Sequence, residues 1–157
     1  MRVSVQEADF DVGAETEALA AGRADVGAVA SFVGYVRADK LAGESAAEQA
    51  VSAMTLEHYP GMTEKSLEAI VAEAESRWSL LGVRVIHRFG RLVPGDRIVF
   101  VGVAGSHRGE AFAACEFIMD YLKTRAPFWK KEDTPEGGRW VDAREADDAA
   151  AEKWRQA

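Results

Sequence analysis

Positively charged side chains gather at both ends of one predicted helix, in the stretch from Ser106 to Lys131. His107 and Arg108 stand where that helix begins, directly after an apolar run. Four further cations stand near its other end, within nine positions that contain no acidic residue: Lys123, Arg125, Lys130 and Lys131. Guanidinium groups and the free N–H groups of a helix N-terminus both favour phosphate or carboxylate. These residue types therefore predict a pocket that binds an anion.

Lys123 is the first candidate for a reacting group. A lysine held beside other cations and apolar rings holds its proton less firmly, so it can act as a nucleophile or carry a proton near neutral pH. The structural alternative is that lysines at a helix C-terminus complement the helix dipole, while Phe128 and Trp129 pack as core. Four cations so close together repel one another, and a structural helix end gains little from the third and fourth. We therefore favour the chemical interpretation.

The length of the predicted helix limits how its two charged ends can cooperate. Fifteen positions separate Arg108 from Lys123, which corresponds to about 22 Å along one helix. One small ligand cannot touch both ends. We therefore predict that His107 and Arg108 reach the Lys123 pocket of a second subunit across a two-fold interface.

The composition excludes several classes of protein. An apolar fraction of 48% with 29% charged residues is typical of one soluble domain, predicted to span residues 1–157, and no apolar run is long enough to cross a membrane. The net charge of -7 argues against nucleic-acid binding, because an acidic surface repels phosphate backbones. The N-terminus lacks a secretory signal and one cysteine cannot form an internal disulfide, so we predict a cytoplasmic protein. The three histidines have no ligand spacing, so no metal site is predicted.

The middle of the charged helix is predicted to pack against a core. Its apolar residues recur at the three- and four-residue spacing of a helix stripe: Phe112, Cys115, Met119 and Leu122. The stripe includes the single cysteine, and no basic neighbour is placed to make its thiol a thiolate. We expect Cys115 to be a buried structural residue.

Strands and helices are predicted to alternate along the rest of the chain. A long strand over 27–37 ends at Arg37, and the segment 38–50, rich in Ala, Gly, Glu and Ser, is predicted to be a mobile surface loop. The other predicted elements are strands over 51–58, 83–89 and 97–104, and helices over 63–81 and 145–155. Thr63 is expected to cap the first of these helices and Gly82 to end it. This order predicts an α+β fold, a mixed sheet with helices on a face.

Three longer segments are similar to one protein family. They are LEHYPGMTEKSL at 56–67, PGDRIVFVGVAGSHR at 94–108 and FIMDYLKTRAPFWKKE at 117–132. They closely resemble the MoaE family, the large, catalytic subunits of molybdopterin synthase, and the resemblance spans nearly the whole chain. It implies a largely antiparallel mixed sheet with helices packed on it, the α/β hammerhead of that family.

The resemblance also implies a reaction. Two sulfurs are transferred to cyclic pyranopterin monophosphate to form the dithiolene of molybdopterin. The sulfur arrives as a C-terminal thiocarboxylate on a ubiquitin-like, MoaD-like small subunit, whose Gly-Gly tail inserts into the pocket. The implied assembly is a homodimer at the centre of a heterotetramer, which agrees with the distance argument. This scheme requires no metal or redox cofactor, because molybdenum enters later, on the product.

Residue roles follow from the motifs that match. Arg37 corresponds to the arginine that ends the GxVR strand of the family, and with the HR pair, His107 and Arg108, it is expected to bind the substrate phosphate. Lys123 and Lys130 correspond to the two pocket lysines. Lys123 is expected to act at the reacting carbon, as a proton donor and acceptor or as a transient nucleophile, and Lys130 to stabilise developing negative charge.

Four neighbours of these residues complete the predicted substrate site: Tyr35, Val36, Lys131 and Glu132. Two departures from the family pattern affect the pocket. The segment 38–50 is longer and richer in alanine than is usual in the family, and Glu110 brings a negative charge close to Arg108. Acidic residues in the first turn of a helix are also ordinary partners of the dipole.

Two other functions are compatible with parts of this pattern. A non-catalytic module that binds a phosphate ligand or a partner would keep the fold and the pocket, but it needs charge rather than two lysines. Nucleic-acid binding through the basic and aromatic segment TRAPFWKK at 124–131 is disfavoured by the overall negative charge. The sulfurtransferase remains the principal hypothesis.

Overall fold

The strands of this chain form two four-stranded sheets, in a computed structural model that describes residues 2–38, 53–134, 137–141 and 145–155. The first sheet has the order β1 (Val3–Gln6), β4 (Leu80–Arg88), β6 (Arg97–Gly105) and β2 (Ala28–Tyr35). The second has the order β5 (Gly90–Leu92), β3 (Ala53–His58), β7 (Phe128–Thr134) and β8 (Gly137–Val141). Strand β1 runs parallel to β4, and every other pairing is antiparallel. The predicted α+β class with a mixed, largely antiparallel sheet is confirmed.

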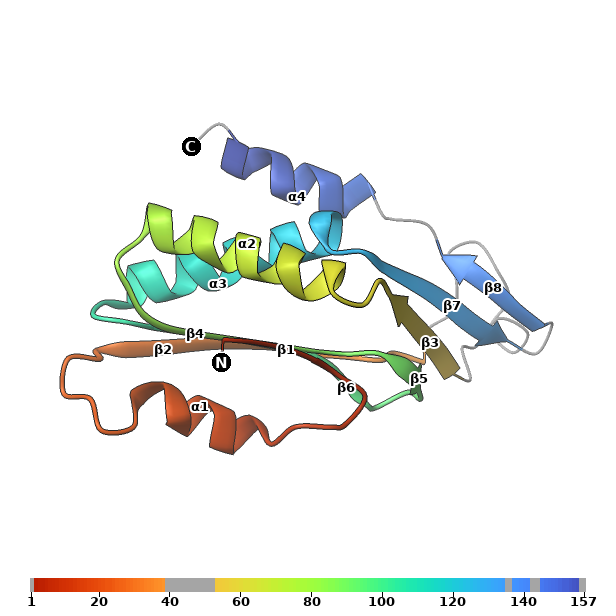
Figure 1. Cartoon of the computed structure of the whole chain (residues 1–157), viewed down its shortest axis with the longest axis horizontal. Helices are drawn as coiled ribbons and strands as arrows, with labels where there is room; N and C mark the ends of the chain where they lie inside the picture. The colour runs from red at the N-terminus through yellow and green to blue at the C-terminus, as the bar shows by residue number, and fades with distance from the viewer. Residues whose placement is uncertain (1, 39–52, 135–136, 142–144, 156–157) are drawn as a thin grey trace.

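Helices cover both faces of the first sheet (Figure 1). Helix α1 (Val12–Ala20) lies on one face. Helices α2 (Met62–Arg77) and α3 (Arg108–Arg125) lie on the other, and α4 (Glu145–Arg155) packs over them as a further layer. The second sheet lies beyond one end of the α2–α3 layer, where the chain leaves α3 and enters β7. The molecule therefore has a helix–sheet body and a smaller sheet at one end.

The main core lies between the first sheet and helices α2 and α3. Alternation along β4 directs Val83 and Val85 toward these helices and Ile86 toward α1. The neighbouring strand β6 is central in the sheet, so it is buried on both faces and reads as a continuous apolar run. This buried body supplies the rigid support from which α3 projects its charged ends.

Cys115 is part of this core, as predicted. Its side chain is buried, and its thiol donates to the carbonyl oxygen of Val101 at 3.7 Å. Burial raises the pKa of the Cys115 thiol to about 11, so the thiolate is scarce at neutral pH. The cysteine is therefore a structural residue.

Some predicted details are wrong. Phe112 is 65% exposed, because the buried face of α3 is centred on Ala111, Ala114 and Ile118 instead. Helix α2 ends at Arg77, so Gly82 lies inside β4 and does not end a helix.

The start of α2 also differs from the prediction. The residue before the helix is Gly61, whose φ of 84° suits glycine, and its N–H donates to the Glu64 carboxylate at 2.7 Å. Thr63 is buried in the first turn, where its hydroxyl binds the backbone of Tyr59. The loop predicted at 38–50 lies outside the described residues from position 39 onward.

Candidate active site

Lys123 and Lys130 lie on either side of the connection between α3 and β7. The helix ends where the Ala126 N–H donates to the Leu122 carbonyl at 3.3 Å, and Pro127 cannot continue it. The Phe128 N–H donates back to the Ala126 carbonyl at 2.9 Å, so the strand begins almost at once. This tight connection keeps the last turn of α3, with Lys123, close to the first residues of β7.

Near the two lysines, flat rings from β3, β4, β7 and the end of β4 contact one another. His87 of β4 stacks on Phe128 of β7, with ring centroids 3.8 Å apart and an interplanar angle of 19°. The ring of His58 in β3 lies 6.1 Å from that of Phe128 and 4.4 Å from that of Phe89. His58 also contacts the Thr63 hydroxyl at 3.2 Å, which orders the turn into α2. These rings join the two sheets at the place where the lysines gather.

His87 is neutral, and both Lys123 and Lys130 lie near it. Burial lowers the pKa of His87 to about 3, against an ordinary value of 6.5. The hydrogen bond with the Arg88 carbonyl opposes this shift, whereas the neighbouring charges of Lys123 and Lys130 add to it. Both ammonium groups are therefore close enough to His87 to act on its protonation.

The depressed pKa of His87 predicts how stability depends on pH. Below pH 6.5 the unfolded chain binds a proton at His87 that the folded chain does not bind, so the free energy of unfolding falls as the pH decreases toward 3. For this group alone the loss between pH 7 and pH 5 is about 2 kcal/mol. Urea unfolding at both pH values should therefore show a smaller difference for His87→Phe than for the unchanged protein. Equal pH dependence in the two proteins would contradict a neutral, buried His87.

Arg37 lies just beyond the end of strand β2, toward the same end of the molecule as the two lysines. Strand β2 ends at Tyr35, and Val36 is buried in a small core cluster with Met54, Leu56 and Leu92. The Val36 N–H donates to the Asp96 carbonyl, and the Gly95 N–H donates to the Val36 carbonyl, each at 2.9 Å. Leu56 is the β3 partner of Lys130 in β7. Arg37 is exposed and directly follows Val36. Val36 packs in the same cluster as Leu56, and Leu56 pairs with Lys130, so Arg37 lies toward the same end of the molecule as Lys130.

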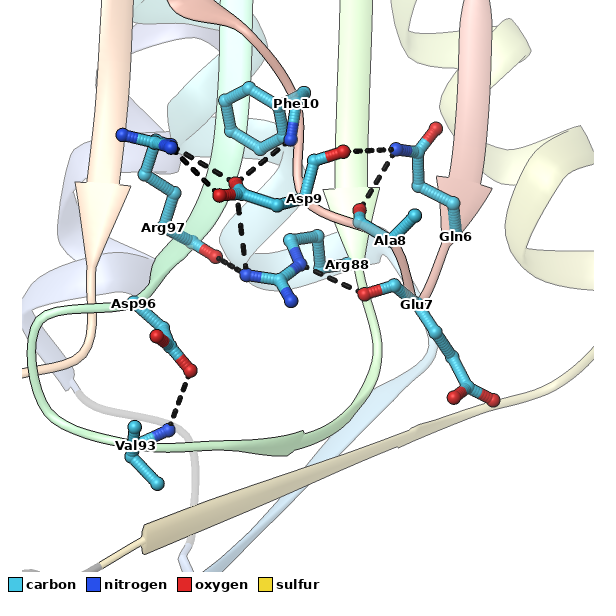
Figure 2. Close-up of polar contacts among 9 residues, drawn as sticks. All are labelled: Gln6, Glu7, Ala8, Asp9, Phe10, Arg88, Val93, Asp96 and Arg97. Atoms are coloured by element: carbon cyan, nitrogen blue, oxygen red, sulfur yellow. Dashed lines mark hydrogen bonds and ion pairs between the residues drawn. The ribbon is translucent and has the colours of Figure 1, made fainter.

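A polar network holds the ends of neighbouring strands together (Figure 2). Asp9 accepts hydrogen bonds from the Arg97 guanidinium at 2.7 and 3.0 Å, and Arg88 donates to the carbonyls of Glu7 and Arg97. The Arg97 guanidinium lowers the pKa of the Asp9 carboxyl. Arg97 is also the β6 residue that pairs with Tyr35 of β2. The network thus ties the end of β1 to the start of β6 and to the end of β2.

His107 and Arg108 stand at the other end of α3, as predicted. His107 is the residue before the helix and Arg108 is its first residue, and both side chains are exposed. The segment before His107 packs closely against Gly27, whose N–H donates to the Gly105 carbonyl at 3.0 Å. A Cβ on Gly27 would lie 2.0 Å from the Ser106 carbonyl oxygen, so only glycine fits there. Since α3 is one continuous helix, a single chain does not bring this pair to the lysines.

The remaining predicted residues lie along β7. Alternation puts Lys131 on the face opposite to Lys130, where it is exposed, and the backbone of Glu132 lies opposite Met54 of β3. Glu110 lies in the first turn of α3, with one carboxylate oxygen buried and without a hydrogen-bond partner in the described residues.

His87 is the residue of this region that sequence reasoning missed. It follows Val83 and Val85 at the inward positions of β4, so a polar side chain stands where the alternation calls for an apolar one. That break in the pattern is visible in the sequence, but its meaning depends on the contact with Phe128. Among the residues that the structure describes, no group of three or more His, Cys, Asp or Glu side chains is arranged to hold a metal ion. None of the helices in the described ranges combines the length and apolar character that crossing a bilayer demands.

Comparison with known proteins gives matches over most of the chain. The MoaE family, described as MoaE protein, matches residues 5–125. The "Molybdopterin synthase catalytic subunit" of Ralstonia nicotianae is 62% identical over 152 residues, covering 97% of this chain and 83% of the relative. The protein of the same name from Pseudomonas aeruginosa is 58% identical over 156 residues, covering 99% of this chain and 100% of the relative.

Solved structures give the same picture. The molybdopterin biosynthesis MoaE protein from Burkholderia ambifaria has a TM-score of 0.80 and 55% identity, and the alignment covers 98% of this chain and 97% of that chain. A protein–protein complex of subunits 1 and 2 of molybdopterin-converting factor from Helicobacter pylori contains a chain with a TM-score of 0.71 and 19% identity. That alignment covers 90% of this chain and 91% of that chain, and it shows a shared fold.

Proposed function

We propose, since the chain belongs to the MoaE family, that it is the catalytic subunit of a molybdopterin synthase. In this proposal it transfers sulfur from a thiocarboxylated, ubiquitin-like small subunit to cyclic pyranopterin monophosphate and so forms the dithiolene of molybdopterin. The observation that carries the proposal is identity of 62% and 58%, over nearly the whole chain, to two proteins named molybdopterin synthase catalytic subunit. The same names favour an enzyme over a non-catalytic binding module.

The proposed reaction exchanges sulfur for oxygen without oxidation or reduction. A thiocarboxylate carbon and a carboxylate carbon have the same oxidation state, so the small subunit ends as an ordinary carboxylate when its sulfur has left. On the substrate, a carbon–oxygen bond is replaced by a carbon–sulfur bond, and the displaced oxygen leaves in water or on the carrier. The balance therefore needs proton transfer and stabilisation of anions, but no electron donor or acceptor. Side chains that carry protons and positive charge are sufficient for these steps.

Lys123 and Lys130 are the proposed catalytic residues. Lys123 acts at the reacting carbon, where it moves a proton or attacks the carrier's carbonyl as a transient nucleophile. Lys130 stabilises negative charge that develops on oxygen or sulfur. Their support is the shared position near neutral His87, whose ring stacks on Phe128.

The substrate phosphate is proposed to bind the three remaining cations. Arg37 comes from the same chain as the lysines, whereas His107 and Arg108 come from the second subunit of a homodimer. Guanidinium groups suit this task because they are permanently charged and donate paired hydrogen bonds. The start of α3 adds free N–H groups and the positive end of the helix dipole. Tyr35, Val36, Lys131 and Glu132 remain proposed neighbours of the bound substrate.

A small subunit is the partner of this chain. The related fold in the Helicobacter pylori structure occurs in a complex of subunits 1 and 2 of molybdopterin-converting factor. We propose that the small subunit inserts a C-terminal Gly-Gly tail toward Lys123, since glycine alone lets an extended backbone enter a narrow pocket. The resulting assembly is a heterotetramer around the homodimer. A cytoplasmic location is part of the same proposal.

Reconstitution from purified components tests the function. The protein, a thiocarboxylated small subunit and cyclic pyranopterin monophosphate should together yield molybdopterin, with two carriers consumed for each product. The matched control is the same small subunit ending in an ordinary carboxylate, which should yield none. Absence of product with the thiocarboxylate, while the substrate still binds, would support the binding module instead.

A further inference from the structure

His87 occupies an unusual place at the end of an apolar surface. It continues the inward positions of Val83 and Val85 along β4, and its neighbours in the sheet are Val5 of β1 and Val99 of β6. The side chain is 6% exposed, and within the described residues only Thr63 is another buried polar side chain. A polar group in such a position costs stability unless its hydrogen bonds are made. A buried polar ring at this position is therefore a candidate for a role beyond filling space.

Two contacts fix the His87 ring. Its Nδ1 lies 2.8 Å from the Arg88 carbonyl oxygen, and because a carbonyl can only accept, Nδ1 carries the hydrogen. One face of the ring stacks on Phe128 at 3.8 Å. The hydrogen bond holds the plane of the imidazole, and the stack transfers that orientation to a residue of another sheet. Offset or near-parallel stacks of this kind contribute about 0.5–1.5 kcal/mol beyond area burial.

Phe128 lies between α3, which carries Lys123, and the part of β7 that carries Lys130. It is the first residue of β7, two positions before Lys130 and on the same side of the strand, and it follows the turn that ends α3. Lys123 lies in the last turns of α3, before that turn. Displacement of the Phe128 ring would therefore move the start of β7 relative to the end of α3. Such a movement would change the separation of Lys123 and Lys130.

We propose that His87 is a positioning residue for sulfur transfer, whose imidazole seats Phe128 and thereby sets Lys123 and Lys130 at their working separation. This inference rests on the proposed function and assigns a role to a residue outside the predicted site. The ring must also be uncharged, because a third cation would repel both ammonium groups. Burial meets that requirement by lowering the pKa of His87 to about 3.

Two substitutions of similar polarity separate positioning from packing. His87→Phe and His87→Leu both fill the site with an apolar side chain and both lose the hydrogen bond to Arg88, but only phenylalanine keeps a flat ring against Phe128. Val85→Ala, on the same face of β4 and fully buried, is the control for lost core packing. All three are compared in the reconstituted reaction for kcat and for the KM of the pterin, with unfolding by urea as a measure of stability.

The stack predicts a division between these variants. His87→Leu should lower kcat about tenfold or more with KM unchanged, since a displacement near 1 Å at a reacting group costs up to about a hundredfold. His87→Phe should keep kcat within about threefold of the unchanged protein, and Val85→Ala should keep kcat while it loses stability. Equal kcat for the Leu and Phe variants, whether both high or both low, overturns the proposal. If the unchanged protein makes no product, the proposed function fails instead, so the two failures are distinguishable.

Discussion

Replacement of Lys123 by alanine is expected to lower the rate of molybdopterin formation by at least about a hundredfold, because a positioned proton donor or acceptor contributes about 10²–10⁴-fold to catalysis. A nucleophilic role would make the loss larger. The fold should survive the change. Lys123 is exposed at the end of α3, where a lysine contributes only a few tenths of a kcal/mol through the helix dipole.

The measurement is the reconstituted reaction with Lys123→Ala, together with urea unfolding and binding of the thiocarboxylated small subunit. Lys65→Ala is the matched control, since Lys65 is an exposed lysine on α2. It removes the same charge and should leave the rate unchanged. Full activity of Lys123→Ala would remove Lys123 from the mechanism, and its unfolding would show that the lysine is structural.

Mixing two inactive variants is expected to restore activity. In the proposed homodimer each pocket takes Lys123 from one subunit and Arg108 from the other. Lys123→Ala and Arg108→Ala should each abolish turnover alone, because every pocket carries one lesion. A mixed dimer has one pocket with both lesions and one with neither. With random exchange, half of the dimers are mixed, so about a quarter of the pockets become intact.

The experiment unfolds and refolds the two variants together, or exchanges their subunits, and then assays the reconstituted reaction. The control pairs Lys123→Ala with Lys130→Ala, both of which come from the same subunit of a pocket. In that mixture every pocket still lacks either Lys123 or Lys130, so it should stay inactive. If the first mixture also stays inactive while its parents bind the small subunit, then Arg108 does not act across a two-fold interface.

The fold could be predicted because most of it follows local patterns. The stripe Leu67, Ile70, Val71 and Ala74 predicts α2, and the strands predicted over 83–89 and 97–104 form most of β4 and β6. Strand β7 was not predicted. It contains Lys130, Lys131, Glu132 and Asp133 in succession, which no local rule assigns to a strand. Its structure comes from pairing with β3, which is distant in the sequence.

The same distinction applies to the candidate site. Charge clustering identified Lys123 and Lys130, because four cations in an acidic chain stand out in the sequence. His87 could not be assigned a role in this way. Its meaning depends on a ring contributed by β7 and on burial at the end of the first sheet, and both are tertiary properties. Apolar periodicity describes where a side chain points, but not which distant residue meets it there.

The unbroken helix α3 has a consequence for how chains of this fold can vary. It runs for 18 residues with a charged group of the proposed site at each end. Each residue added within it would turn one end by about 100° relative to the other and lengthen it by about 1.5 Å. Surface turns can gain or lose residues without moving either end. In the proposed dimer, α3 therefore fixes the distance and the angle between its two charged ends, and we expect an insertion or deletion within α3 to abolish activity where one in a surface turn does not.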